Sequence, residues 1–156
     1  MRINKSWRTA ISRHKISKPM HWLMNCNLIG EYSLLDFGCG RGTDVNFLKL
    51  LRYNRTVGYD PHFFPVMPNG CFDVVTCIYV LNVIPDPVER ANILAEAQSY
   101  VRTGGNIYVA IRADKSNLKG WTRNDTWQGY VADTLECLGF EQIHQGQFEI
   151  WVTRNT

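Results

Sequence analysis

The sequence predicts an α/β fold, a compact doubly wound and mostly parallel sheet with an antiparallel hairpin at its C-terminal end. Three observations lead to this prediction. Short apolar stretches alternate with helical patterns along the chain, which is typical of a parallel sheet with helices on both faces. A glycine-rich turn follows the first apolar stretch directly. Two alternating stretches on either side of a glycine close the chain, as in a hairpin.

The first half of the chain contains a strand, a glycine turn, a helix and two further strands. Residues 33–38, SLLDFG, are an apolar run suited to a strand that is buried on both faces. From Thr43, which is placed to cap the first turn, the pattern becomes helical. The second strand, residues 56–60, ends at a proline because proline offers no backbone donor. A loop rich in proline and aromatic residues then leads to a third strand over residues 72–81.

The second half adds a helix, a strand, another helix and the closing hairpin. Asp86 is expected to cap a helix that has Pro87 at its first position and stops at Gly104-Gly105. The remaining predicted elements are a fourth strand (106–112), a long polar loop (113–125), a third helix from about Thr126 to Gly139, and two hairpin strands (140–146 and 148–154).

Length and composition limit the class of protein. The 156 residues suffice for one compact domain, and no apolar run approaches the ~18 residues that a membrane span needs. The five cysteines form no C-x-x-C pair and the four histidines are scattered singly, so we expect reduced thiols and no metal site. These features favour a cytoplasmic protein that makes no membrane contact.

The glycine turn selects among nucleotide ligands. Its glycines stand at positions 38, 40 and 42, whereas the dinucleotide fingerprint would need a glycine where Thr43 stands, and the lysine of a P-loop is missing. Asp36, two residues before the first glycine, would repel a pyrophosphate but suits a cationic ligand. Asp60, at the end of the second strand, is placed to accept both hydroxyls of a ribose. The two carboxylates together favour S-adenosylmethionine, which carries an ammonium and a sulfonium.

The pattern D-x-G-x-G-x-G after a strand, with an acid closing the next strand, resembles the class I S-adenosylmethionine-dependent methyltransferases. The resemblance runs from about residue 33 to the end and implies a Rossmann-like fold and transfer of a methyl group from the cofactor. TAISR at 9–13, Ser17 and Pro19, DFGCGRGTDV, GYDP, YVLNVIPDPVER and TWQGYV are also similar to methyltransferases that accompany DNA phosphorothioation systems. That narrower likeness places residues 9–19 within the functional domain.

The chain departs from the wider family after its second strand. Only residues 61–71 precede the third strand, too few for the helix, strand and helix that usually intervene, and the acid that usually binds adenine is absent. His62, Phe63, Phe64 and Met67 either cover the adenine or pack in the core. The expected cofactor-binding residues are Asp36, Gly38, Cys39, Gly40, Asp44, Asp60, Pro61, His62 and Tyr79.

Residues 1–30 form a basic segment that contains no acid. Such a segment is a solvated arm, a patch for phosphates or nucleic acid, or a transit peptide. We expect it to pack on or near the cofactor site, with residues 31–156 forming a single methyltransferase-like domain.

Three residues are candidates for catalysis. Tyr79 and Asn82, at the end of the third strand, are expected to face the methyl acceptor, and His62 is a candidate base near neutral pH. The stretch from Asn82 to Pro85 matches the Asn-Pro-Pro-aromatic motif of amino-methyltransferases only at its asparagine, which argues against an exocyclic amine of a nucleobase as the acceptor.

Two functions remain open at this point. One is an active methyltransferase whose unidentified acceptor is a small molecule, or a nucleic acid held by residues 2–18 and Arg41. The other is a catalytically silent module that binds S-adenosylmethionine, or a partner subunit of a nucleic-acid modification system.

Overall fold

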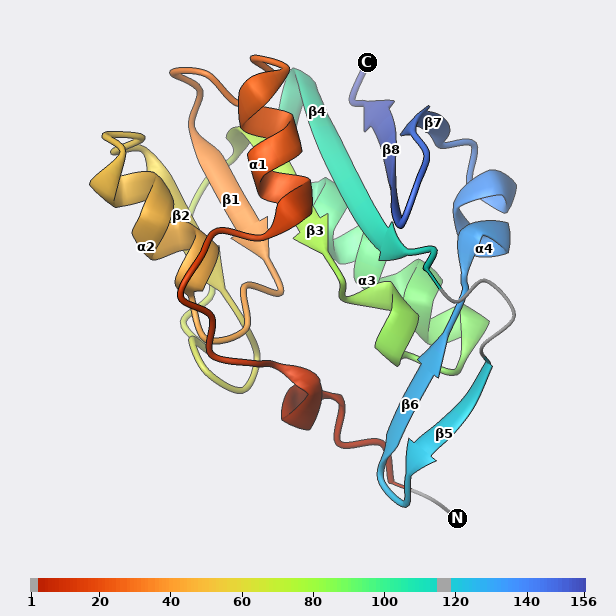
Figure 1. Cartoon of the computed structure of the whole chain (residues 1–156). Coiled ribbons are helices and arrows are strands. Elements are labelled where there is room, and N and C mark those ends of the chain that lie inside the picture. Colours follow the sequence, from red (N-terminus) through yellow and green to blue (C-terminus); the bar gives the residue numbers. More distant parts are fainter. Residues whose placement is uncertain (1–2, 115–118) are drawn as a thin grey trace.

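The computed structural model of the chain describes residues 3–114 and 119–156. A six-stranded sheet carries helices on both faces, and a two-stranded hairpin lies beyond one end of it (Figure 1). In chain order the elements are η1 (Ser6–Thr9), α1 (Lys18–Asn25), β1 (Leu34–Phe37), α2 (Thr43–Leu50), β2 (Thr56–Tyr59), β3 (Phe72–Ile78), η2 (Leu81–Val83), α3 (Pro87–Ser99), β4 (Val101–Arg112), β5 (Lys119–Arg123), β6 (Thr126–Gly129), α4 (Ala132–Cys137), β7 (Glu141–His144) and β8 (Phe148–Arg154).

The strand order of the large sheet is β2-β1-β3-β4-β8-β7. The first four strands are parallel, β8 is antiparallel to β4, and β7 pairs with β8 in the predicted hairpin. The predicted fold class is therefore confirmed. Strand β2 lies at the edge, because the short segment between β2 and β3 adds no strand beyond it.

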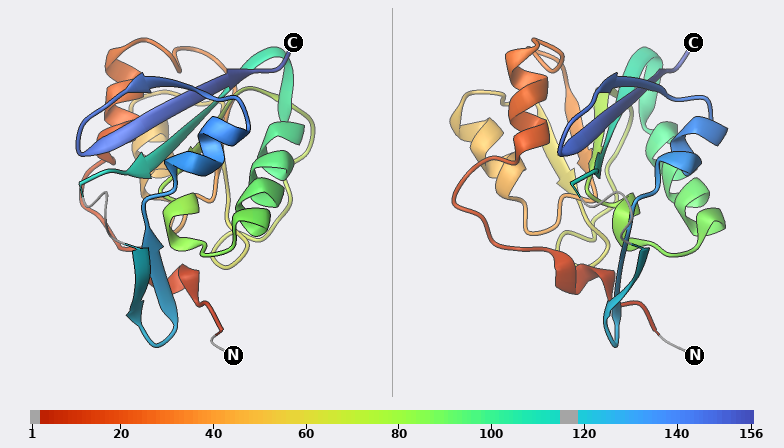
Figure 2. Two further views of the ribbon diagram at one scale, coloured as in Figure 1. Left: turned by 90° about the vertical axis from the view of Figure 1, so that its right-hand side faces the viewer. Right: turned by 45° about the vertical axis from the view of Figure 1, so that its right-hand side comes forward.

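Two layers of helices cover the sheet (Figure 2). Successive residues of β1 point to opposite faces, and all four are buried, as expected for a parallel strand that is covered on both sides. Leu34 packs in one cluster with Met20 of α1 and Leu48 of α2, and Leu35 packs in the other with Leu94 of α3. The carboxyl ends of the parallel strands meet at one edge, which the segment before α1 crosses (Figure 1).

The basic N-terminal segment contains a helix that the sequence patterns do not predict. Ser17 caps α1 by accepting a hydrogen bond from the N–H of Met20, and Pro19 occupies the first turn. Met20 and Leu23 are fully buried against the sheet. The apolar face of α1 is therefore part of the core, and the description of a solvated arm does not apply to this helix.

The predicted third helix is wrong over its first half. Residues 126–129 form β6, which pairs antiparallel with β5 inside the predicted polar loop, and α4 covers only residues 132–137. Residues 115–118 of that loop lie outside the described part of the chain. The spacing of Trp127, Val131 and Leu135 imitates a helix because all three are buried, although Trp127 is in a strand.

Three further boundaries differ from the prediction. The third strand ends at Ile78, since Tyr79 turns into the left-handed region (φ +58°) and η2 follows. Asp86 caps α3 as predicted, but the helix ends at Ser99, so Gly104-Gly105 lie inside β4. Thr43 is the first helical residue of α2 and not its cap, a position held by Gly42.

Candidate active site

The glycine turn after β1 places backbone without side chains at the carboxyl ends of β1 and β2. Gly38 has a φ of +82°, and a Cβ atom there would lie 2.4 Å from Cγ2 of Val80, so no larger residue fits. The N–H groups of Gly38 and Cys39 both donate to the carbonyl of Tyr59, at 2.7 and 2.9 Å, which fastens the turn to the end of β2. Burial raises the pKa of the Cys39 thiol, so that side chain stays neutral.

The carboxylate of Asp60 is oriented by backbone donors. Its Oδ2 accepts a hydrogen bond from the N–H of Gly40 at 3.0 Å, and its Oδ1 accepts from the N–H groups of His62 and Phe63 at 2.9 and 3.1 Å. The backbone of Asp60 also pairs with that of Phe64, which closes the loop around the exposed Pro61. A carboxylate oxygen accepts about two hydrogen bonds, so Oδ2 keeps acceptor capacity for a hydroxyl group.

Two acids, Asp36 and Asp44, are buried beside the turn. Asp36 is 3% exposed and accepts a hydrogen bond from the hydroxyl of Thr76 at 2.9 Å. Burial, together with the charge of Asp44, raises the pKa of Asp36 to about 7, while Arg13 acts in the opposite direction. No ion pair joins Asp36 to a cation of the described residues, so this position suits a cationic group of a ligand.

Asp44 already has partners within the chain. Its two carboxylate oxygens accept hydrogen bonds from the N–H and the hydroxyl of Ser17, at 2.7 and 2.6 Å. The side chain that we predicted to bind the cofactor thus holds the N-terminal segment.

The structure separates His62 from the other two catalytic candidates. The imidazole of His62 is exposed and stacks on Trp7, with 4.1 Å between ring centroids and 8° between planes. Phe63 meets the same imidazole edge-on. His62 therefore stays with the Asp60 loop and is not among the residues that line the cavity described next.

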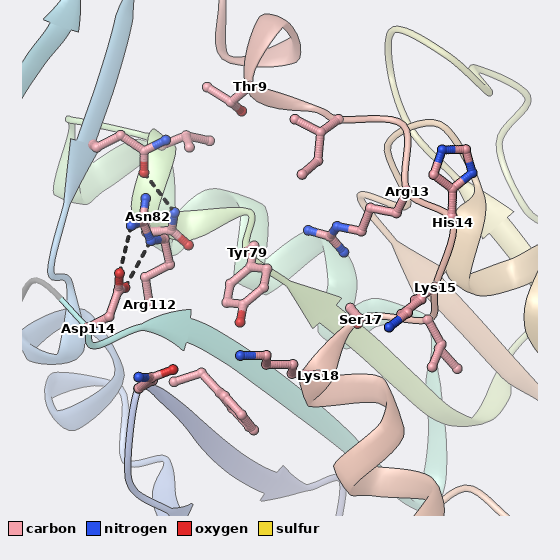
Figure 3. Close-up of a pocket in the computed structure, with 16 residues that line it drawn as sticks. Thr9, Arg13, His14, Lys15, Ser17, Lys18, Tyr79, Asn82, Arg112 and Asp114 are labelled. Carbon is pink, nitrogen blue, oxygen red and sulfur yellow. Dashed lines mark hydrogen bonds and ion pairs between the residues drawn. The ribbon is translucent and has the colours of Figure 1, made fainter.

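A cavity of about 800 Å³ opens between the N-terminal segment and the ends of the central strands (Figure 3). Arg13 and Lys18 line it from one side, and Tyr79 and Asn82, which follow β3, line it from the other. Gln128 of β6 completes the far end. The structure thus brings Tyr79 and Asn82 together. Arg13 and Lys18 were noticed in the sequence only as part of a basic segment.

Tyr79, directly after the last residue of β3, is held in a strained conformation. Its φ of +58° is uncommon for a residue with a side chain, and its N–H is fixed by a 2.9 Å hydrogen bond to the carbonyl of Ala110. The guanidinium carbon of Arg13 lies 5.8 Å from the centroid of the ring. Burial raises the pKa of Tyr79, so its hydroxyl remains protonated at neutral pH and acts as a hydrogen-bonding group.

Asn82, in the wall of the cavity, contains an unsatisfied buried acceptor. The side chain is 2% exposed, and its Nδ2 donates to Oε1 of Gln128 at 3.1 Å. Its Oδ1 is buried and has no hydrogen-bond partner. Buried polar atoms are rarely left unpaired, so this oxygen calls for a donor supplied by a ligand.

Comparison with known proteins identifies the family. Residues 6–144 match a family model described as a methyltransferase domain. The chain belongs to this family. The sequence-based expectation of a methyltransferase is thereby confirmed, and no curated protein sequence matches the chain.

Solved structures of methyltransferases share the fold. The 1,6-didemethyltoxoflavin-N1-methyltransferase of Burkholderia thailandensis, solved with its substrate and S-adenosylhomocysteine, has a TM-score of 0.68 at 15% identity, over 89% of this chain and 77% of its own. The N-methyltransferase NodS of Bradyrhizobium japonicum WM9, solved with S-adenosylhomocysteine, has a TM-score of 0.60 at 15% identity over 88% of this chain and 86% of its own. An O-methyltransferase family protein of Burkholderia thailandensis has a TM-score of 0.57 at 11% identity, over 88% of this chain but only 55% of its own.

The described residues offer neither a membrane-spanning helix nor a metal site. Within residues 3–114 and 119–156, no helix has both the length and the apolar character needed to span a membrane. The same part of the chain contains no group of three or more His, Cys, Asp or Glu side chains placed to hold a metal ion.

Proposed function

We propose that this methyltransferase takes its methyl group from S-adenosylmethionine, bound at the carboxyl ends of β1 and β2, and transfers it to a small molecule in the adjoining cavity. The observation that carries the proposal is the placement of Asp36 and Asp60 on either side of the glycine turn. Tyr79, at the end of the neighbouring strand, lines the cavity.

The residues of the turn fit the proposed cofactor. Asp36, a buried carboxylate without an ion-pair partner among the described residues, accepts the ammonium group. Asp60 accepts a ribose hydroxyl at Oδ2, the oxygen that its three backbone donors leave with free capacity. Gly38, Cys39 and Gly40 offer backbone at close approach. Pro61, His62 and Phe63, which directly follow Asp60, would contact the adenine.

Bound S-adenosylmethionine supplies an electrophilic methyl group, so the chain chiefly has to orient the acceptor. Asn82 Oδ1 accepts a hydrogen bond from an N–H or O–H of the acceptor, which fixes its nucleophilic end. The neutral hydroxyl of Tyr79 donates or accepts a second hydrogen bond. His62 lies outside the cavity, so its contribution is to the cofactor side of the site.

The cavity favours an active enzyme over a silent cofactor-binding module. Its volume of about 800 Å³ is within the ~300–1,000 Å³ of small-molecule sites, and a module would have no use for it. One fold neighbour, the 1,6-didemethyltoxoflavin-N1-methyltransferase, was solved with 1,6-didemethyltoxoflavin bound. The narrower likeness to methyltransferases of DNA phosphorothioation systems rests on sequence stretches alone and stays a prediction.

Isothermal titration with S-adenosylhomocysteine tests the cofactor site. We expect Asp60→Asn, which keeps the size of the side chain, to weaken binding at least about tenfold because a charged acceptor becomes neutral. Asp133→Asn, an exposed change of the same kind on α4, is the matched control and is expected to bind as the natural chain does. Equal affinity of all three proteins would refute the proposed site.

Incubation with a trideuteromethyl-labelled donor tests the reaction. The enzyme is offered a metabolite extract, DNA and RNA separately, and mass spectrometry follows the label. Label in a small molecule supports the proposal, whereas label only in nucleic acid would assign the other acceptor class. Binding of S-adenosylhomocysteine without any labelled product would favour the silent module.

A further inference from the structure

The cavity is charged in a way that selects its occupant. We propose that the methyl acceptor is a small anionic molecule with an apolar planar body, whose oxyanion group binds Arg13 and Lys18 and whose N–H or O–H group binds Asn82. This inference rests on the proposed function, since it takes the cavity to be the acceptor site. The oxyanion is a carboxylate or a phosphate, which share the chemistry that two cations recognise.

Uncompensated positive charge is the first observation. Arg13, Lys15 and Lys18 line the cavity, and none of them forms an ion pair with a carboxylate of the described residues. The acid in the lining is Asp114, which is bound to Arg112 by hydrogen bonds of 3.0 and 2.9 Å. Residues 1–2 and 115–118 contain no Asp or Glu either, so they cannot supply the missing carboxylate.

Two of these cations, Arg13 and Lys18, converge. Figure 3 shows the side chains of Arg13 and Lys18 both extending toward the ring of Tyr79. Arg13 also acts on the buried carboxyl of Asp36, so it stands on the cofactor side and can serve the carboxylate of the cofactor as well. Lys18 has no such second role and is therefore the residue that best reports on the acceptor.

The opposite end of the cavity, at Asn82, favours a hydrogen-bond donor. Asn82 Oδ1 is a buried acceptor without a partner, and an oxyanion there would be repelled by it. Val83 and Phe148 add apolar surface to the lining, along with the ring of Tyr79. The fit is to a molecule that is anionic at one end, apolar in the middle and able to donate a hydrogen bond at the other.

A nucleic-acid backbone fits this arrangement less well. Arg8 is engaged in an ion pair with Asp125 at 2.6 Å, and Arg41 lies over the ring of Phe63 and donates to the carbonyl of Ala10. The basic residues of the N-terminal segment therefore do not form one continuous row for successive phosphates. The unpaired ones point to a single compact anion.

Fluorescence titration of the enzyme saturated with S-adenosylhomocysteine tests the inference with two dyes. 1-Anilinonaphthalene-8-sulfonate carries an aromatic body, an N–H and an oxyanion, and N-phenyl-1-naphthylamine is the same molecule without the oxyanion. We expect Lys18→Gln to weaken binding of the anionic dye at least about tenfold and to leave the neutral dye within about twofold. Asn82→Ala is expected to weaken both dyes. Lys49→Gln, an exposed change on α2, is the charge-matched control.

Competition distinguishes the source of the oxyanion. Displacement of the anionic dye by 4-hydroxybenzoate assigns a carboxylate, and displacement by phenyl phosphate assigns a phosphate. Methyl 4-hydroxybenzoate, which lacks the charge, is expected to displace either dye less effectively than 4-hydroxybenzoate. Displacement only by a single-stranded DNA 20-mer, or an anionic-dye affinity that Lys18→Gln leaves unchanged, would overturn the inference. So would failure of both dyes to bind. The affinity of Lys18→Gln for S-adenosylhomocysteine, measured alongside, shows whether the cofactor site still holds in that case.

Discussion

The carboxylate of Asp44 accepts hydrogen bonds from both the N–H and the hydroxyl of Ser17, at 2.7 and 2.6 Å. The same hydroxyl oxygen accepts a 3.3 Å hydrogen bond from the N–H of Met20 and so caps α1. One buried carboxylate, in the first turn of the helix that follows the glycine turn, therefore fastens the segment that forms a wall of the cavity. This contact between Asp44 and Ser17, called the Ser17 joint below, therefore links the cofactor side of the site to the acceptor side.

Removal of the Ser17 joint is expected to loosen the N-terminal segment. Asp44→Ala leaves two buried donors of Ser17 unpaired, so we expect the free energy of unfolding to fall by about 3 kcal/mol in urea titrations. Ser17→Ala keeps the backbone hydrogen bond to Asp44 but loses the helix cap and the hydrogen bond from the hydroxyl to Asp44, so we expect a smaller cost of about 2 kcal/mol. Equal losses in the two variants would show that the Ser17 joint does not work as the distances indicate.

Asp36 makes the stability of the free protein depend on pH. The pKa of its carboxyl is raised from 3.8 to about 7, first by burial and then by Asp44, so the folded chain holds a proton there that the unfolded chain releases between these values. The contribution of Asp36 to stability therefore falls as the pH rises from about 4 to 7, and the full penalty is present above pH 7. Asp36→Asn removes this penalty. We expect the variant to gain more than about 1 kcal/mol at pH 8 and little at pH 4; a gain that does not change with pH would contradict the argument.

The same carboxyl predicts a pH dependence of cofactor binding. Binding of an ammonium group needs ionised Asp36, so the affinity for S-adenosylhomocysteine is expected to fall as the pH drops below about 7. Isothermal titration at pH 5.5, 6.5 and 7.5 measures this. Asp36→Asn is expected to bind weakly at each pH, because it carries no charge to lose. Natural protein that binds equally at all three values would place the ammonium elsewhere.

The sequence predicts those parts of the site that are local to one strand and its turn. Asp36, Gly38 and Asp60 could be recognised because their positions after successive apolar stretches define where parallel strands end. The contact between Ser17 and Asp44 could not, since the two residues lie 27 positions apart in the sequence and meet only through the packing of α1 and α2 on the sheet. The convergence of Lys18, Asn82 and Gln128 likewise depends on how three separate segments pack.

The mistaken helix over residues 126–131 has a related cause. Trp127 and Val131 repeat at a helical spacing, but Trp127 is buried by a hairpin that packs against η2 and the guanidinium of Arg90. A short buried strand followed by a short helix gives the same apolar pattern as one long helix. Only the tertiary contacts decide between them.

A further restriction on the glycine turn can be measured directly. Gly38→Ala would place a Cβ atom 2.4 Å from Cγ2 of Val80 and would force a side chain into a φ of +82°, so we expect a loss of about 2–4 kcal/mol in urea titrations. The double change with Val80→Ala relieves the clash but not the backbone strain and is expected to recover part of the loss. Gly146→Ala, where a Cβ atom meets its nearest neighbour at 3.6 Å, serves as the control. A full recovery in the double variant would mean that the clash alone fixes the glycine.

Arg90 is expected to hold in place the segment that follows Asn82 at the acceptor end of the cavity. Its fully buried guanidinium donates to the carbonyls of Ile84 and Pro85, at 2.6 and 3.2 Å, and to the hydroxyl of Thr134 at 2.8 Å, and so holds the chain directly after Asn82.

Arg90→Met fills similar space but leaves these acceptors unpaired, so we expect a loss of about 3 kcal/mol in the free energy of unfolding. Arg90→Lys keeps one donor group and is expected to lose less. Both affinities are measured under conditions where both variants are folded. The affinity for S-adenosylhomocysteine should be retained, because Asp36 and Asp60 lie at other strand ends. The dye 1-anilinonaphthalene-8-sulfonate should bind more weakly to Arg90→Met. An unchanged affinity for that dye would show that Asn82 keeps its place without Arg90.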